Sequence, residues 1–417
     1  MKLRNAWWGP PKKFSTEFED RKVICLELFY DLVYVIAISR ITHHLAEHPD
    51  VTGLLDYTYF FVMIFWGWLN GSLYHDLHGT SGVRTSLMTL WQMMIVAGLV
   101  VTVNNSGENM LFNITICVMI MQLYITYLWW SVGIYDKVHR RLNRPWTVIY
   151  LSSFALMVLT LFLEQPYIRI VFYLTLVLNY LPPFVVQNLL RRESSDFNLS
   201  SSMAERMGLF TIIIFGETIL GVVTGTSELG KLNWEVWINF GLSIMIVFAL
   251  WWIFFSLVSD RPCRPGYVNS HKMELLYIPT LMGLGVTGVA FSSLFQGHTH
   301  PETENAYLLK VGFGVAMCLF LTGITLMLTF LEYPDGYQNS KRSIQKRLAI
   351  TIAVLLLATC LNIVLDLGIY LMIVLGVLVI FILTVQASWL KIEAGIIANT
   401  NEQHSRNESA YHRRIYY

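Results

Sequence analysis

The chain has 417 residues, of which 55% are hydrophobic and only 14% are charged. A soluble globular domain usually carries about a quarter charged residues, so this composition excludes an ordinary soluble domain. The formal net charge of +1 gives no sign of a nucleic-acid partner, and we expect none.

Apolar runs of about 20 residues, the length that crosses a bilayer core, recur along the whole chain. Only helices satisfy every backbone polar group of a lipid-facing segment, so each run predicts a transmembrane helix. The fold class is therefore all-α, a polytopic integral membrane protein with about twelve crossings. The predicted helices occupy residues 23–46, 55–75, 84–104, 109–135, 146–164, 168–190, 204–225, 234–258, 272–296, 306–331, 347–366 and 368–390.

Lys and Arg side chains are concentrated in alternate loops. With the N terminus inside, the predicted inner segments hold 25 of them, whereas the outer loops hold only Arg169, Lys231 and Lys310. Cytoplasmic loops collect Lys and Arg, so both termini are predicted to be cytoplasmic. The loops are short, and any chemistry is expected from the helices and their ends.

The first predicted helix, with the stretch "CLELFYDLVYVIAISRITHHL", carries charges that each cost about 2.5 kcal/mol or more in hydrocarbon. Glu27 and Asp31 are four residues apart and share a face, with Tyr34 one turn further on. Arg40 lies about half a turn out of phase with Asp31, so each is expected to find its partner on another helix. Near the cytoplasmic surface, an interfacial ion pair is the alternative explanation for Glu27.

The seventh predicted helix, "MAERMGLFTIIIFGETIL", has one stripe that contains Arg206, Phe210, Glu217 and Gly221. Glu217 is close to the middle of the span, where an unpaired carboxylate is most costly and readily binds a proton or a cation. Arg206 lies near the predicted cytoplasmic surface, where an interfacial ion pair would also explain it. In the sixth helix, Pro182 and Pro183 predict a kink that frees backbone carbonyls.

Faint internal similarity suggests two six-helix halves. Glu205 opens the seventh helix as Glu27 opens the first, and a helix with paired Trp follows each of them. Such a repeat would run parallel about an axis along the membrane normal, with a site between the halves. The expected units are residues 1–198, which include a short basic segment 1–22, residues 199–395, and a polar, largely disordered cytoplasmic tail at 396–417.

Two groups of histidine and acidic side chains lie on the predicted outer side and give weaker signals. The loop "GHTHPETE" groups His298, His300, Glu302 and Glu304, and His43, His44 and His48 share that side. A metal site is conceivable on these residue types, but a solvated loop is the better interpretation, and we expect neither a metal nor another cofactor. The first outer loop holds Glu47, Asp50 and Asp56, as a lipid-dependent membrane transferase would require, although such enzymes usually have bulkier outer loops.

The stretches "LELFYDLVYVIAISRITHHL" and "ERMGLFTIIIFGETIL" resemble the two signature blocks of the bacterial low temperature requirement A (LtrA) family. The resemblance implies a multi-pass protein of the cell (plasma) membrane, but no settled substrate. Carried over by position, it points to Glu27, Phe29, Tyr30, Asp31 and His44 in the first helix and to Glu205, Arg206, Gly208, Gly216 and Glu217 in the seventh.

Our leading hypothesis is a secondary transporter or permease, not an enzyme. Asp31 and Glu217 would form one midplane proton or cation site across a wet interior, while Arg40 contacts an anionic group or serves as countercharge. The candidate substrate- or ion-binding residues are Asp31, Glu217, Arg40, Glu27, Tyr34, Arg206 and His44. Expected partners are membrane lipids and an unknown small molecule or ion, with homo-oligomerisation left open. The alternatives are a lipid flippase or scramblase, a membrane transferase that uses Asp50, and a sensor that acts through the tail.

Overall fold

The structure is a computed structural model that describes residues 23–80, 82–104, 110–135, 140–164, 167–189, 199–229, 232–259, 261–297, 304–333, 338–365 and 368–415. Within these ranges the regular structure is α-helical, apart from an isolated bridge between Cys263 and Leu331. The helices are α2 (Cys25–Glu47), α3 (Val51–His78), α4 (Val83–Asn104), α5 (Met110–Tyr135), α6 (Arg140–Thr160), α7 (Tyr167–Tyr180), α8 (Pro182–Leu189), α9 (Ser201–Ser227), α10 (Trp234–Leu257), α11 (Tyr267–Gly297), α12 (Glu304–Phe330), α13 (Gln338–Leu365) and α14 (Tyr370–Ile415).

Eight of the described helices are long and apolar enough to cross a membrane, namely α4, α5 and α9 to α14. The all-α class is thus confirmed, and each of the twelve predicted ranges overlaps a described helix, the sixth overlapping two, α7 and α8. The number of crossings and the cytoplasmic position of the termini stay predictions. Helices α2, α3 and α6 are not among the eight, and α7 is a shorter apolar helix of 14 residues.

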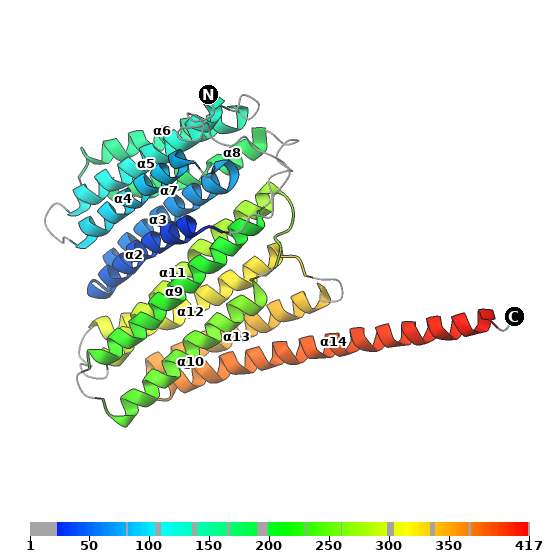
Figure 1. Ribbon diagram of the computed structural model, residues 1–417. Helices are drawn as coiled ribbons and strands as arrows, with labels where there is room; N and C mark the ends of the chain where they lie inside the picture. The colour runs from blue at the N-terminus through cyan, green and yellow to red at the C-terminus, as the bar shows by residue number, and fades with distance from the viewer. Residues whose placement is uncertain are drawn as a thin grey trace.

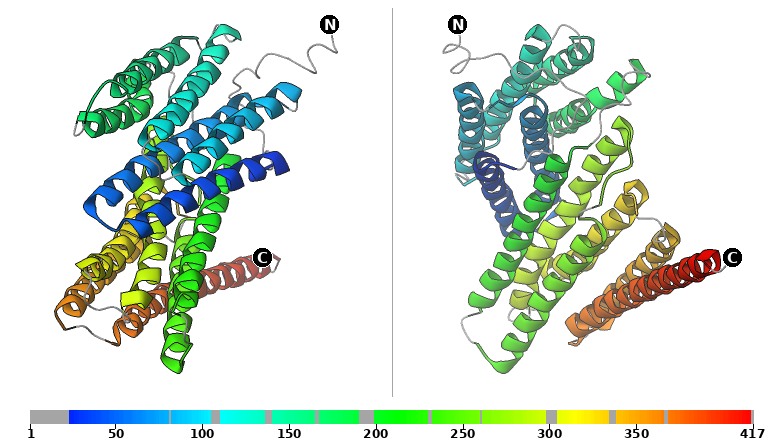
Figure 2. Two further views of the ribbon diagram at one scale, coloured as in Figure 1. Left: turned by 90° about the vertical axis from the view of Figure 1, so that its left-hand side faces the viewer. Right: turned by 45° about the vertical axis from the view of Figure 1, so that its right-hand side comes forward.

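The helices form two groups, α2 to α8 and α9 to α14, which can be followed in Figure 1 and from two other sides in Figure 2. Their neighbours follow one order: α2 packs on α3 and α4, and α9 packs on α10 and α11. Likewise α3 contacts α7 as α10 contacts α14, and α5 contacts α6 as α12 contacts α13. The parallel repeat stays a prediction that this matching order supports. The groups meet mainly where α2 lies against α9 and α11.

The predicted kink in the sixth segment separates α7 from α8. α7 ends at Tyr180 and α8 begins at Pro182, because proline lacks the N–H that would continue the ladder of hydrogen bonds. The Asn179 carbonyl, which precedes the break, accepts a 3.0 Å hydrogen bond from the indole of Trp66 on α3. A carbonyl at the break therefore fixes α7 against α3.

The last helix differs from the expected disordered tail. α14 runs without a break to Ile415 and extends away from the rest of the molecule. Residues 396–415 contain neither proline nor glycine, and the apolar part of α14 supplies a preformed turn on which helix propagates without a new nucleation step.

Close packing of α9 on α11 depends on two glycines. A Cβ atom at Gly221 would lie 2.5 Å from the carbonyl oxygen of Gly288, and one at Gly288 would lie 3.0 Å from the Cα of Thr218. Small residues allow helix backbones to approach in this way. Thr218 uses the proximity to donate a hydrogen bond across to the Leu284 carbonyl at 3.2 Å.

Candidate functional site

Asp31 forms a buried ion pair with Arg206. Its side chain is fully buried, and its two oxygens accept hydrogen bonds from Nη2 of Arg206 at 2.5 Å and from Nε at 3.3 Å. The indole of Trp68 donates a third hydrogen bond at 2.7 Å. Such bidentate, charge-assisted contacts are strong and directional, so this pair holds α2, α3 and α9 in one arrangement.

Aromatic rings enclose the guanidinium of Arg206. Its central carbon lies 5.5 Å from the centre of the Tyr30 ring and 5.9 Å from that of the Trp68 ring, within the range of a cation–π attraction. The Arg206 side chain is 1% exposed. This end of the α2–α9 contact is therefore dry.

Glu27 is also buried, at the start of α2. Its carboxylate accepts a 3.1 Å hydrogen bond from the backbone N–H of Ile24, the residue that precedes the helix. In return, the backbone N–H of Glu27 donates to the Ile24 carbonyl at 2.9 Å. The two hydrogen bonds satisfy N–H groups that a helix start otherwise leaves without a partner. Glu27 thus has a local structural task, and the structure assigns it no place beside Glu217.

Glu217 occupies a different environment, further along the same two helices. Its Oε1 atom accepts a 2.7 Å hydrogen bond from the hydroxyl of Ser39, and Nε2 of His43 lies 3.8 Å away. The Glu217 side chain is 12% exposed. It faces a cavity of about 240 Å³ that is bounded by α2, α9 and α11.

The cavity wall is rich in acidic and polar groups. Besides Glu217 and His43, it includes the carboxylates of Glu47 and Glu228. Hydroxyl groups of Thr42 and Thr224 and the glycines Gly221 and Gly288 complete most of the lining. Carboxylate and hydroxyl oxygens are the ligands that hard cations prefer, and a wall of one charge sign attracts ions of the other. The cavity is therefore suited to a proton or a cation.

The structure does not bring Asp31 and Glu217 into one site. Ser39 lies eight residues beyond Asp31, and Glu217 lies eleven beyond Arg206, which corresponds to about 12 and 16 Å along the helix axes. Apolar side chains between the two contacts, such as Ile38 on α2 and Ile214 on α9, are fully buried. The expected shared site is replaced by a dry ion pair at one level and an acidic cavity at another.

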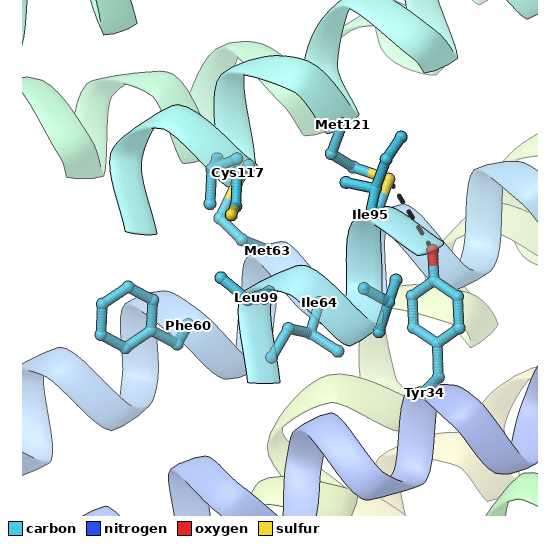
Figure 3. Close-up of a pocket in the computed structure, with 10 residues that line it drawn as sticks. Tyr34, Phe60, Met63, Ile64, Ile95, Leu99, Cys117 and Met121 are labelled. Carbon is cyan, nitrogen blue, oxygen red and sulfur yellow. Dashed lines mark hydrogen bonds between the residues drawn. The ribbon is translucent and has the colours of Figure 1, made fainter. Parts of the chain in front are cut away.

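Tyr34 belongs to the packing of the first group. Its hydroxyl accepts a 2.7 Å hydrogen bond from Gln92 on α4 and contacts the sulfur of Met121 on α5 at 3.8 Å. Beside it lies an apolar cavity of about 20 Å³, shown in Figure 3. A space of this size holds one water molecule at most, and the binding role of Tyr34 stays a prediction.

Arg40 and His44 also lie apart from Asp31. Arg40 is exposed, in keeping with its half-turn offset on α2, and Arg206 takes the role of countercharge to Asp31. A partner for Asp31 on another helix is thus confirmed, but Arg40 does not provide the charge. His44 is half-buried near the end of α2, with its ring centre 4.8 Å from that of His48.

Asp50 and Asp56, two of the acidic residues that a membrane transferase would use, each contact a neighbouring group. Asp50 precedes α3 and accepts a 2.6 Å hydrogen bond from the N–H of Gly53, as an N-cap residue does. Asp56 lies 3.4 Å from Arg169 on α7. His298, His300 and Glu302 of the other acidic loop lie outside the described residues, and the side chain of Glu304 is not described either.

A larger cavity of about 630 Å³ was not anticipated from the sequence. It lies between α9, α10, α11 and the segment that joins α10 to α11. Phe254, Phe255 and Tyr277 form an apolar part of its wall, whereas Glu205 and Arg261 give it charge. The only signal in the sequence was the polar start of the seventh helix, which does not reveal that α10 and α11 close around it.

Cys263 lines this larger cavity and offers a test of how dry its wall is. Burial raises the pKa of the Cys263 thiol to about 11, and only the thiolate reacts with maleimide. At pH 8 we expect a variant that keeps Cys263 as its only cysteine to react about 100-fold more slowly than the same chain unfolded in detergent. The rate should rise about tenfold per pH unit up to pH 10. Equal rates before and after unfolding would show an open, wet wall.

Comparison with known proteins gives two findings. The family model described as "Bacterial low temperature requirement A protein (LtrA)" matches residues 22–385. An uncharacterized protein of Rhizobium meliloti (strain 1021) is 26% identical over 318 residues, which cover 72% of this chain and 76% of that protein. The range matched by the family model, residues 22–385, includes both the Asp31–Arg206 pair and the Glu217 cavity.

Proposed function

The chain belongs to the bacterial low temperature requirement A family, and on this premise we propose that it is a secondary transporter of the plasma membrane in which Glu217 binds a coupling proton or cation. The observation that carries the proposal is the cavity, which places Glu217, Glu47, Glu228 and His43 around one space. We further propose that the chain crosses the membrane several times with both ends in the cytoplasm.

The position of Glu217 between two helix groups supports this role. The register that aligns Glu27 with Glu205 also aligns Ser39 with Glu217, and these two residues are hydrogen-bonded at 2.7 Å. Equivalent positions meet at a two-fold axis, so this contact is what a parallel repeat predicts there. In transporters built from repeats, ions bind at the interface of the halves near the midplane.

Asp31 and Arg206 have a complementary role in the proposal. Their buried pair joins α2 to α9 at the end where these helices begin, while the cavity opens the same contact further along. A transporter exposes its site to one side at a time through movement of one bundle against the other. We therefore place the fixed contact at Asp31–Arg206 and the ion-accessible side at Glu217.

Replacement Glu217→Gln tests the proposal, because glutamine keeps the size of the side chain and removes the titrating charge. Wild-type protein would be reconstituted in liposomes with a pH-sensitive dye inside, and gradients of Na⁺, K⁺, Li⁺ and Ca²⁺ would be imposed in turn. We expect at least one gradient to drive proton movement. The variant should slow that movement about tenfold or more, as loss of a proton-transferring group does.

Glu205→Gln is the matched control, since it removes a carboxylate from the same helix outside the Glu217 cavity. It should leave the rate within about twofold of wild type. If no cation gradient moves protons in the wild type, or if a folded Glu217→Gln protein transports at the wild-type rate, the proposed coupling is wrong.

The amphipathic cavity favours a lipid-handling protein as the second candidate. Its volume of about 630 Å³ and its mixture of aromatic and charged walls suit one acyl chain with part of a headgroup. Movement of a fluorescent lipid between leaflets in the same liposomes separates the two functions. A rate that responds to Tyr277→Trp, which fills this cavity, and not to Glu217→Gln would favour the lipid function.

A further inference from the structure

The end of α2 brings together three metal-ligating side chains, His44, Glu47 and His48. One nitrogen of each histidine and one carboxylate oxygen all lie within 4.8 Å of one another. The histidines are four residues apart and the glutamate is three residues beyond the first, so the helical repeat places all three on one side of α2. Their convergence follows from α2 continuing as helix to Glu47, with His48 as the C-cap whose N–H is bonded to the carbonyl of His44.

We propose that His44, Glu47 and His48 form a binding site for a divalent first-row transition ion of the Zn²⁺ class. Imidazole nitrogen and carboxylate oxygen are its usual protein ligands, at about 2.0–2.2 Å from the ion. Two ligand atoms of a tetrahedral site are then about 3.3 Å apart. The ligand atoms now lie within 4.8 Å of one another. Rotation of the three side chains can shorten these distances to about 3.3 Å without movement of the backbone.

The backbone around the site is already fixed. The N–H of His48 donates to the carbonyl of His44 at 3.0 Å, and the N–H of Asp50 donates to the carbonyl of His48 at 2.9 Å. The close approach of Gly53 to the carbonyl of His48 packs the start of α3 against this turn. Ligands held on a rigid turn lose little entropy when an ion binds.

The electrostatic surroundings favour a cation. The C-terminal end of a helix carries a partial negative charge. The Asp56 carboxylate on α3 lies close enough to interact with His44, although its ion pair with Arg169 offsets part of that charge. Glu47 also borders the acidic cavity that contains Glu217. His44 is half-buried, whereas Glu47 and His48 are exposed, so an ion reaches the site from solvent. The three protein ligands leave a position for water.

Zn²⁺ alone is the probe that tests this site. Purified full-length protein in detergent would be dialysed against Zn²⁺, and the bound metal would be counted per chain as the free concentration is varied. We expect one ion per chain, and a loss of affinity of about 100-fold in the double variant His44→Ala, His48→Ala. Glu47→Gln should weaken binding about tenfold. Co²⁺ should give visible absorption bands that the double variant lacks.

The comparison variant is His43→Ala combined with Glu217→Gln, which removes a histidine and a carboxylate from the adjoining cavity and leaves the three proposed ligands in place. This variant should bind Zn²⁺ as wild type does, and its thermal stability would be measured together with that of the His44, His48 variant. The proposal fails if no ion binds above background, or if the His43, Glu217 variant and not the His44, His48 variant loses the metal. The test uses no transport assay, so its result is separate from that of the proposed function.

Discussion

Replacement Arg206→Leu is expected to lower the free energy of unfolding by about 3–5 kcal/mol. It leaves the fully buried Asp31 carboxylate with the indole of Trp68 and without a countercharge. Removal of one partner from a buried pair is costly because the remaining charge has neither water nor an opposite charge to stabilise it. The measurement is thermal unfolding in detergent, followed by the intrinsic fluorescence of the 13 tryptophans, which include the buried Trp66 and Trp68.

Two further variants show whether the pair itself is responsible. Arg40→Leu removes an exposed arginine from α2 and should change the stability by no more than about 0.5 kcal/mol. The double variant Asp31→Leu, Arg206→Leu removes both charges and should recover most of the loss, because apolar residues often replace a buried ion pair without cost. If Arg206→Leu behaves like Arg40→Leu, the pair does not hold α2 and α9 together.

The sequence predicted the helices and the faces that matter on them. Arg206 and Glu217 were assigned to one stripe of the seventh helix, and both side chains contact α2. The half-turn offset between Asp31 and Arg40 correctly indicated that Asp31 has its partner on another helix. These results follow from helical periodicity alone, which is a local property of the chain.

The levels of Asp31 and Glu217 along the α2–α9 contact were not predictable in the same way. Asp31 meets Arg206 across 175 residues of chain, and the contact depends on how far α2 is shifted along α9. A hydropathy pattern has no information on that shift, so two acids near the middle of their spans were expected to face one space. The same limit concealed the larger cavity, which three helices enclose.

The histidines at the end of the first helix show a different limit. His43, His44 and His48 were recognised as a group, but a solvated loop was the preferred interpretation for that side. Continuation of α2 to Glu47 converts the spacing of His44 and His48 into one face of a helix. One residue of helix beyond the predicted end, followed by the C-cap His48, brings these side chains together.

Replacement Gly221→Ala is expected to destabilise the protein by about 1–3 kcal/mol and to change the Glu217 cavity. The added methyl would lie 2.5 Å from the backbone oxygen of Gly288. Backbone cannot rotate away as a side chain does, so α9 and α11 must separate, and their contact loses dispersion energy over its length. Gly216→Ala is the matched control, because its methyl would have nothing within 4 Å, and it should stabilise helix α9 by about 0.5–1 kcal/mol. Thermal unfolding of the two variants in detergent measures the difference. Equal stability would mean that α9 and α11 are further apart than described, and the cavity beside Glu217 would then have lost one of its walls.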